Sequence, residues 1–329
     1  SNGTSQVNSN GFFGVMYPLT KDGYTYRVNN NGNNGIYFTF FVNNNGFIDP
    51  TTQLPLYKSL TNTDATFLAG KVQDPNATDT ALNITHKMFY TLPSSDLPTS
   101  SIGAVPGGST WLKNPVIVPV VTNLSLVGVE GTSGQVSYKG GYIKFNADVQ
   151  GSYKIVIQGT PANPGFVTRT LTGSSIAGAN QIYWDSKDGA GNASPVGTYP
   201  IVNITVTLQR GEVHFPYIDM EYNRFGTILQ LLDHTNLSGL PLSNIVYWND
   251  EDIPDVTNGT NSSPKNNSHL PPTNSAGISS LTNGHNWGLN GNGTAGQFGD
   301  VRAIDTYTFI AGQETTLTTS VTVKSADLM

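Results

Sequence analysis

Residues 182–199 read IYWDSKDGAGNASPVGTY and form the most specific local pattern of the chain. A strand-like run ends at Trp184 and Asp185, a turn rich in Gly and Asn follows, and residues 195–199 start the next strand. The carboxylates of Asp185 and Asp188 can accept hydrogen bonds from nearby backbone amides, which specifies the turn. The segment therefore predicts a hairpin with Trp184 and Tyr199 in a core. Three residues suit the left-handed backbone positions of its turn: Gly189, Gly191 and Asn192.

The same alternation of runs and turns repeats along the rest of the chain. Runs of about four to eight residues rich in Val, Ile, Thr, Tyr and Phe are separated by clusters of Gly, Asn, Pro and Asp, which is typical of β-sandwiches. The Asn/Gly runs at 29–35 and 43–46 are expected to form hairpin turns. Residues 227–235 (TILQLLDHT) fit a short helix or a strand equally well. We therefore expect an all-β chain with little or no helix.

The chain is expected to divide into consecutive β-sandwich modules. A Pro-rich connector, WLKNPVIVP, marks a boundary, because proline removes backbone donors and limits a segment to edge or extended positions. The last module holds a long Asn/Ser/Pro-rich loop at 253–280, which fits either a displayed binding loop or a solubilising tether. The expected parts are an N-terminal module at 1–110, the connector at 111–119, a middle module at 120–207 and a C-terminal module at 208–329.

Composition excludes several classes of function. The chain has 329 residues, no cysteine, a formal net charge of -6 and only 12% charged residues. Without cysteine it can form no disulfide, thiolate metal site or cysteine nucleophile, and without a basic cluster nucleic acid is not an expected partner. No run approaches the roughly 18 apolar residues of a transmembrane helix, so no transmembrane segment is expected. The start at Ser1 and the strand-like end VTVKSADLM lead us to expect a piece of a longer polypeptide.

The pattern W-D-x-x-D-x-x-G-N-x-x-P-x-G-T-Y within residues 182–199 closely resembles a hairpin of the flagellar-hook-cap-type immunoglobulin-like module, which recurs in secreted bacterial repeat proteins. Residues 211–223 (GEVHFPYIDMEYN) resemble the segment that follows this module in large cell-surface gliding and adhesion proteins of Bacteroidetes, exported by the type IX pathway. The stretches NGHNWG at 283–288 and FGDVRAIDTYTF at 298–309 resemble the next part of those proteins, and VKSADLM resembles the opening of a tandem immunoglobulin-like repeat.

The resemblance implies an immunoglobulin-like middle module in a non-catalytic, extracellular structural or adhesive segment of a cell-surface adhesin or surface filament. It implies type IX secretion and a link to gliding motility. The implied partners are other modules or copies of the same surface protein, surface glycans and the secretion machinery of the outer membrane. Asp79-Thr80-Ala81 further resembles the short O-glycosylation signal of that group, which makes Thr80 the expected acceptor.

The one acidic cluster lies in YWNDEDIPDV, where Asp250, Asp252 and Asp255 are close in sequence. Carboxylates beside Asn and backbone oxygens are ligands that Ca²⁺ accepts, and extracellular calcium at millimolar concentration fills even weak sites. A solvated acidic loop explains the same residues without a metal. Calcium is the one cofactor that the sequence suggests.

Glycan recognition calls for an exposed aromatic ring with neighbouring amides, and NGHNWG places Trp287 near Asn283 and His285. The alternative is that Trp287 is a core residue, because large aromatic side chains are more often buried. Both interpretations remain open from the sequence.

The histidines give no catalytic motif, since none is paired at i, i+4 and no G-x-S-x-G is present. His86 and His214 read as packed or edge histidines, and no catalytic residue is expected. Three alternatives to the adhesin interpretation stay open. They are a carbohydrate-binding module, a hydrolase whose triad forms only in three dimensions, and a self-assembling filament subunit that donates a strand from residues 5–16 to a neighbour.

Overall fold

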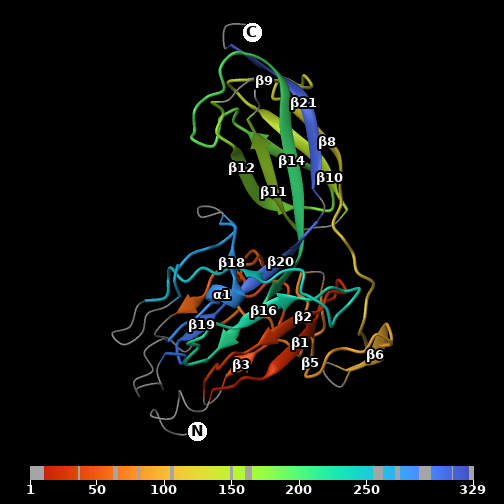
Figure 1. Ribbon diagram of the computed structural model, residues 1–329, viewed down its shortest axis with the longest axis vertical. Coiled ribbons are helices and arrows are strands. Elements are labelled where there is room, and N and C mark those ends of the chain that lie inside the picture. The colour runs from red at the N-terminus through yellow and green to blue at the C-terminus, as the bar shows by residue number, and fades with distance from the viewer. Residues whose placement is uncertain are drawn as a thin grey trace. The chain divides into compact units, whose positions relative to one another are not determined.

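The computed structural model confirms an all-β chain (Figure 1). Within the described residues the only helix is α1 (Ser280–Asn283), and no helix is long and apolar enough to cross a membrane. The structure describes residues 11–35, 38–61, 66–80, 82–103, 107–148, 151–159, 165–254, 262–270, 275–288, 298–312 and 314–325.

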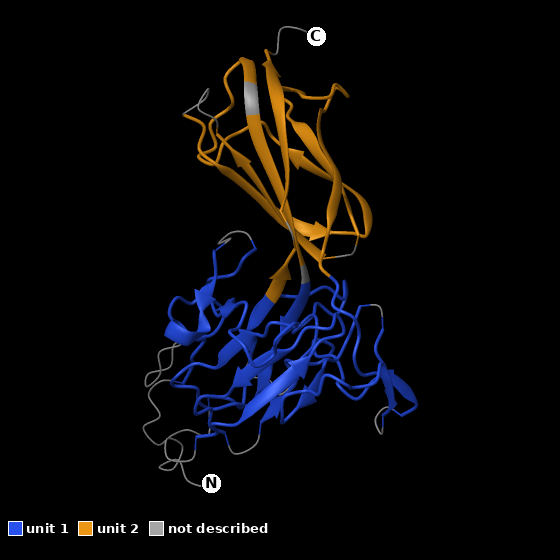
Figure 2. Ribbon diagram, turned by 45° about the vertical axis from the view of Figure 1, so that its right-hand side comes forward, with its two compact units in different colours: residues 1–117, 211–308 blue, residues 118–210, 309–329 orange. Residues whose placement is uncertain are grey.

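The chain forms two compact units, each built from segments that are far apart in sequence (Figure 2). Unit 1 comprises residues 1–117 and 211–308, and unit 2 comprises residues 118–210 and 309–329. This division differs from the three consecutive modules expected, because the N-terminal and C-terminal segments share one unit. The physical reason is strand pairing: Leu60 lies opposite Ala303 in an antiparallel pair, so the two segments complete each other's sheet.

Unit 1 contains a four-stranded antiparallel sheet in the order β16-β2-β1-β5. Its strands are β16 (Ile228–Leu231), β2 (Tyr26–Asn29), β1 (Val15–Leu19) and β5 (Lys87–Phe89). The ambiguous segment 227–235 therefore forms a strand in its first half. Val15 and Met16, part of the strand considered for donation to a neighbour, pair with Asn29 and Val28 of the same chain, and residues 1–10 lie outside the described residues.

A second four-stranded sheet of unit 1 has the order β3-β15-β19-β4, and two small sheets pair β17 with β18 and β6 with β7. Apolar side chains such as Trp287, Tyr217 and Phe47 are fully enclosed around these sheets. The strands are β3 (Thr39–Phe40), β15 (Tyr217–Ile218), β19 (Arg302–Ile304), β4 (Leu60–Thr61), β17 (Ile245–Val246), β18 (Ile278–Ser279), β6 (Ser100–Ile102) and β7 (Ser109–Trp111).

The Asn/Gly runs of unit 1 contain turns, but the first does not join a hairpin. β2 pairs with β1 and β16, whereas β3 pairs with β15, so residues 29–35 lead from one sheet to another. Asn31 and Gly32 have left-handed backbone angles, with φ of 52° and 94°, and Gly46 has a φ of 57°. The composition therefore indicated the backbone geometry correctly, while the strand partners differ.

Unit 2 is a sandwich of two sheets around one core. One sheet has the order β13-β10-β8, and the other has β12-β11-β14-β21-β9, with β20 also paired to β14. Burial alternates along β10, and the buried side chains of both sheets meet in one cluster that includes Phe145, Ile155 and Ile204. The strands are β8 (Val121–Gly128), β9 (Gln135–Ser137), β10 (Gly141–Ala147), β11 (Gly151–Gln158), β12 (Arg169–Ser175), β13 (Gly178–Trp184), β14 (Gly197–His214), β20 (Tyr307–Ala311) and β21 (Thr315–Lys324).

The segment at 182–199 connects the two sheets of this sandwich and is not a hairpin. β13 ends at Trp184 in one sheet and β14 begins at Gly197 in the other. Trp184 is buried and Tyr199 packs against the same core, as expected. The segment therefore closes one end of the sandwich.

Asp188 organises this connection through hydrogen bonds to the backbone. Its Oδ1 accepts from the amides of Ala190 at 2.9 Å and Asn192 at 2.8 Å, and its Oδ2 lies 3.4 Å from the amide of Val167. Burial alone would raise the pKa of Asp188, but these hydrogen bonds outweigh burial and hold the pKa below its ordinary value.

Of the three residues expected at left-handed positions, Gly191 has such an angle, with φ of 83°. Gly189 is required for a different reason, because a Cβ there would lie 2.1 Å from the carbonyl oxygen of Thr168. Asn192 is not left-handed, and Ser186, with φ of 60°, takes the second such position in the turn.

Candidate functional site

All five histidines lie in unit 1, where His234 is the exposed one. His214 ends β14, His86 precedes β5, His269 lies between β17 and β18, and His285 follows α1. These four are buried. The strands around them come from both ends of the chain, so no local sequence pattern brings these rings together.

Asp250 and His285 form a buried chain of hydrogen bonds with three hydroxyl groups. The Nε2 of His285 lies 2.8 Å from Asp250 Oδ2, and its Nδ1 lies 2.7 Å from Thr306 Oγ1. The hydroxyls of Ser59 and Ser262 donate to the two carboxylate oxygens of Asp250. Burial alone would raise the pKa of Asp250, but His285 and the serines hold it below its ordinary value.

A hydroxyl, an imidazole and a carboxylate in line are also the components of a catalytic triad. Here Asp250, His285 and Thr306 are each at most 1% exposed, and His285 stacks on Trp248 with ring centroids 4.5 Å apart. A substrate has no access to a hydroxyl enclosed in this way. The arrangement therefore satisfies buried polar groups within the fold, which is a structural role.

A second histidine and carboxylate pair lies next to the first. His214 Nδ1 lies 2.8 Å from Asp305 Oδ2, and both side chains are fully buried. Ser59 links the two pairs, because its Oγ accepts from the amide of Asp305 and donates to Asp250. A Cβ on Gly46 would lie 2.4 Å from the His214 ring, so a glycine is needed there.

An aromatic group of Tyr57, Tyr247, Tyr307 and His269 packs beside His214. The ring of Tyr307 stacks on His214 at 5.0 Å, and His269 meets Tyr307 edge-on at 5.4 Å. Tyr57 donates to Glu212 Oε2 at 2.6 Å, and burial raises the pKa of the Tyr57 phenol. These contacts make the histidines part of a packed core.

The pKa of His86 and of His269 is lowered to about 3, first of all by burial. At His86 the nearby Asp79 opposes this shift, while His214, Lys87 and Lys21 add to it. Both rings are therefore neutral in the folded protein at pH values where a histidine of the unfolded chain, with a pKa of about 6.5, takes up a proton. Their contribution to stability is present above about pH 6.5 and is lost as the pH falls toward 3.

We predict that the variant His86→Asn loses less stability in acid than the wild type. Between pH 6.5 and 4.5 the unfolding free energy of the wild type should fall by about 2 kcal/mol relative to the variant, because one proton fewer is linked to unfolding in the variant. An asparagine oxygen can still accept from the Lys21 amide, as His86 Nδ1 does at 3.3 Å. Urea unfolding at several pH values measures the difference. Parallel pH profiles would contradict the burial of a neutral His86.

Glu221 has the opposite pH dependence. Its pKa is raised to about 7, first of all by burial and also by the neighbouring Asp300 and Asp219, against the amide of Gly299, which lowers it. The stability that Glu221 contributes is present below its unfolded pKa and is lost as the pH rises through 7. Because both proteins contain Glu221, its contribution cancels when the unfolding free energies of His86→Asn and the wild type are compared at the same pH.

Glu221 belongs to a cluster of three carboxylates with Asp219 and Asp300 that sequence reasoning missed. One ligand oxygen from each residue lies within 4.8 Å of the others. Such oxygens suit a hard cation. The buried member, Glu221, already accepts from the amide of Gly299 at 2.9 Å, so the cluster is also satisfied within the protein. Asp300 lies far from Asp219 and Glu221 in sequence, and no local signal links them.

The glycan-binding group expected around Trp287 is not at the surface. Trp287 is 0% exposed and donates from Nε1 to the carbonyl of Met220, and His285 is equally enclosed. Asn283 is exposed, and its amide donates to the Ser263 carbonyl. A buried indole cannot stack on a sugar, so Trp287 has the core role that was the alternative.

Of the three residues considered for calcium, the two that the structure describes have separate partners. Asp250 points into the core, and Asp255 lies outside the described residues. Asp252 is exposed and pairs with Lys58 at 2.6 Å. It lines a surface cavity of about 250 Å³ in which Lys71 is a second cation, so this cavity does not suit a metal ion.

Thr80, the residue expected to carry a glycan, lies in an exposed turn. Its Oγ1 accepts from the amide of Asn83 at 3.0 Å. The preceding Asp79 receives a hydrogen bond from Trp111 Nε1 at 2.7 Å, which fixes the turn. The long loop at 253–280 is more ordered than a tether where it is described, because Asn267 and His269 are buried.

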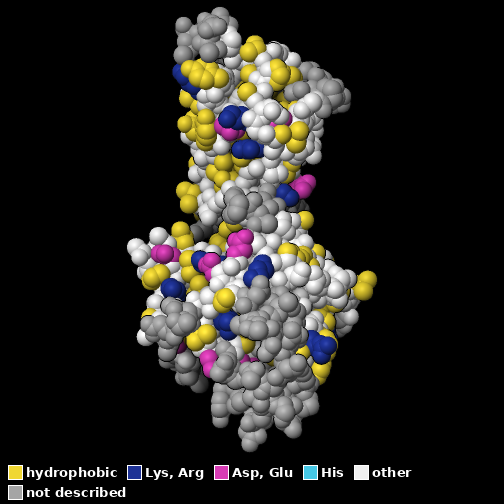
Figure 3. All heavy atoms as spheres, turned by 90° about the vertical axis from the view of Figure 1, so that its left-hand side faces the viewer, with side chains coloured by type: hydrophobic (Ala, Val, Ile, Leu, Met, Phe, Trp, Pro, Cys, Tyr) yellow, Lys and Arg dark blue, Asp and Glu magenta, His cyan; other side chains and the backbone are white. Residues whose placement is uncertain are grey.

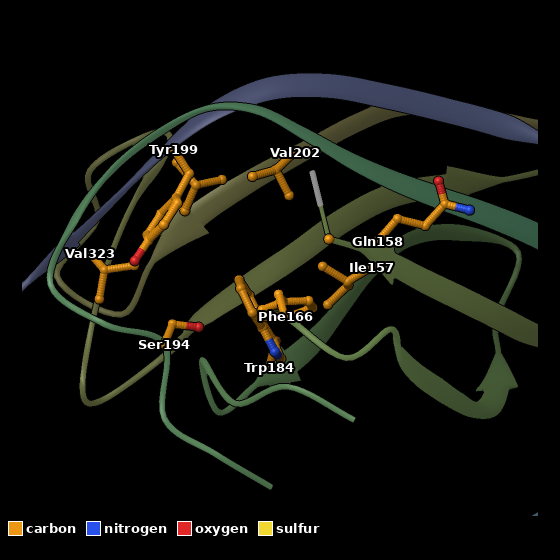
Figure 4. Close-up of a pocket in the computed structure, with 10 residues that line it drawn as sticks. Ile157, Gln158, Phe166, Trp184, Ser194, Tyr199, Val202 and Val323 are labelled. Atoms are coloured by element: carbon orange, nitrogen blue, oxygen red, sulfur yellow. The ribbon is translucent and has the colours of Figure 1, made fainter. Parts of the chain in front are cut away.

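The apolar pocket of unit 2 is too small for a ligand. It lies between Phe166, Trp184 and Tyr199, with the valines of the core behind them (Figure 4). Its volume of about 20 Å³ has room for about one water molecule. It is a packing gap at the end of the sandwich.

The exposed surface offers a different candidate. Charged side chains of both signs are scattered over the described part of the face drawn in Figure 3, without a large patch of one sign. In unit 1 the rings of Phe13 and Phe225 are 62% and 59% exposed. Comparison with protein-family models, with curated proteins and with solved structures gave no match. Function therefore has to be inferred from the chain's own residues.

Proposed function

We propose that this chain is a non-catalytic, extracellular structural and adhesive segment of a cell-surface adhesin or surface filament. The observation that carries the proposal is which side chains of unit 1 are buried and which are exposed. The side chains with catalytic chemistry, such as Asp250 and His285, lie in the core, whereas the large rings of Phe13 and Phe225 face solvent. Binding by a surface fits this distribution better than turnover in a pocket.

Other features support the same role. The unit 2 sandwich has a filled core, and its apolar pocket measures only about 20 Å³, which suits a spacer. The chain has no cysteine and few charges, a composition that suits long extracellular structures. The resemblance of residues 182–199 and 211–223 to type IX exported gliding and adhesion proteins supports a cell-surface location. The partners are then other copies or modules of the same protein and surface glycans.

A carbohydrate-binding module is the second candidate, and the exposed pair of phenylalanine rings favours it. The two functions are compatible, since an adhesin can attach through a glycan.

Labelling of intact cells tests the proposed location. Fluorescent polyclonal Fab fragments raised against the purified chain are expected to label the cells that produce it before any permeabilisation. An antibody against a cytoplasmic protein serves as the control for cell integrity and should label lysed cells alone. Labelling with the Fab fragments that requires lysis would overturn the proposal.

A further inference from the structure

Two phenylalanine rings lie against the same side of Gly32 on the surface of unit 1. A Cβ on Gly32 would lie 3.1 Å from Phe13 Cζ and 3.1 Å from Phe225 Cδ2. Both rings therefore rest against the backbone of one glycine and border each other. Gly32 also has a φ of 94°, which residues with a side chain rarely adopt. Both the backbone angle and the close rings therefore favour glycine here.

Phe13 lies over a second glycine as well. A Cβ on Gly11 would lie 3.2 Å from Phe13 Cε2. A ring that rests on bare backbone exposes its outer face to solvent. Phe13 and Phe225 are 62% and 59% exposed, compared with 41% for Phe12. Phe12 points to the other side of the extended chain, where its ring lies over Gly14.

The two segments that carry the rings are both held to the loop after β2, and on the Phe13 side the amide of Gly32 donates to the Phe12 carbonyl at 3.0 Å. Asn31 Nδ2 donates to the carbonyls of Phe225 at 3.1 Å and Gly226 at 2.8 Å, which ties the loop after β2 to the loop before β16. The rings are therefore arranged before any partner arrives.

A buried network below the surface holds the same loops. Asn33 Nδ2 donates to Thr227 Oγ1 and to Asn30 Oδ1, and Tyr217 donates to the same Asn30 oxygen at 2.9 Å. Asn223 donates to Thr227 and to the carbonyl of His285. Such preorganisation lowers the entropic cost of binding.

We propose that Phe13 and Phe225 form a carbohydrate-binding surface that stacks on the pyranose rings of a surface glycan. The inference rests on the adhesive role proposed above and names its ligand class. The face of an aromatic ring is electron-rich and attracts the C–H groups on the apolar face of a sugar ring. Arg224, whose guanidinium carbon lies 5.9 Å from the Phe225 ring centroid, and Asn31 supply polar groups at the rim for sugar hydroxyls.

The size of the pair favours a sugar over a folded protein. A stable protein interface buries about 800 Å² on each partner around an apolar centre. Here Asn31 is bonded to the loop that carries Phe225 and Arg224 lies over the Phe225 ring, so polar groups border the two rings. An occupant with a narrow apolar face and many hydroxyls matches that surface.

Binding of the whole chain to a printed array of glucose, galactose, mannose, xylose and N-acetylglucosamine oligosaccharides tests this proposal. The wild type is expected to bind at least one of these oligosaccharides. Phe13→Ala and Phe225→Ala should each weaken that binding by about tenfold or more, and Phe225→Trp should retain it. Phe12→Ala is the matched control, because Phe12 is also exposed but lies on the other side of the strand.

Three outcomes would overturn the site. They are no binding to the array, an equal loss in Phe12→Ala, or a wild-type dimer that Phe225→Ala dissociates, which would make this face an interface between copies. Fab labelling of intact cells without glycan binding would remove this site and leave the proposed function standing. Thermal unfolding of each variant confirms that the exposed substitutions leave the fold intact.

Discussion

Replacing Asp250 with alanine is expected to lower the free energy of unfolding by about 3 to 5 kcal/mol. The carboxylate is 1% exposed and holds His285, Ser59 and Ser262 through hydrogen bonds of 2.8 Å or less. The substitution leaves all three partners buried without their acceptor, and such unsatisfied groups bear the full cost of desolvation. Urea unfolding followed by the fluorescence of the buried tryptophans of unit 1 measures the change.

Asp252 is the matched control, because it lies two residues away and its side chain is 58% exposed. Its ion pair with Lys58 is solvated, so Asp252→Ala should change the unfolding free energy by about 1 kcal/mol or less. The variant Asp250→Asn keeps the shape and one acceptor oxygen, and we expect it to lie between these values. Equal effects of Asp250→Ala and Asp252→Ala would show that the histidine and carboxylate network is not structural.

The substitution Trp184→Ala is expected to cost about 3 to 5 kcal/mol in unit 2. Trp184 is 2% exposed, packs edge-on against Phe166 with ring centroids 6.4 Å apart, and donates from Nε1 to the Lys187 carbonyl at 2.9 Å. Its removal leaves a cavity at the closed end of the sandwich and frees one end of the 182–199 connection. Amide hydrogen exchange should show faster exchange in β10 and β13.

Val196→Ala is the control for this substitution, since Val196 lies in the same connection but is 66% exposed. Its effect should stay within about 0.5 kcal/mol. If amide exchange in β10 and β13 is equally slow in Trp184→Ala and Val196→Ala, the indole does not close the core as described.

Much of unit 2 could be predicted from local sequence. Trp184 and Tyr199 were expected in a core, and the turn residues around Asp188 were expected to organise the connection, because short-range hydrogen bonds depend on neighbouring residues alone. What local patterns could not give is the partner of each strand. β13 and β14 belong to different sheets. Which sheet a strand joins depends on how the two sheets pack against each other.

Unit 1 was harder to predict because its pairings are long-range. Leu60 lies opposite Ala303, and Asp305 meets His214 and Ser59, yet nothing in these short segments indicates their partners. The prediction that His86 and His214 are packed was confirmed, since both are buried. The buried position of Trp287 follows from the same long-range assembly.

The exposed pair of rings had one local signal. Phe12 and Phe13 stand between Gly11 and Gly14, and glycines on both sides of an aromatic pair leave room for rings to lie on the backbone. The second ring, Phe225, lies far away in sequence and could be assigned only with the structure. Glycosylation of Thr80 stays a prediction that intact mass of the native protein tests: absence of a hexose-type increment on the peptide with Thr80 would remove it.

The adhesive role proposed above requires the chain to attach cells through its surface. Attachment under flow of the cells that produce it, with and without saturating polyclonal Fab fragments against the whole chain, tests this most directly. We expect several-fold fewer attached cells with these fragments than with non-immune Fab fragments. Unchanged attachment of cells that the Fab fragments visibly label would contradict an adhesive role.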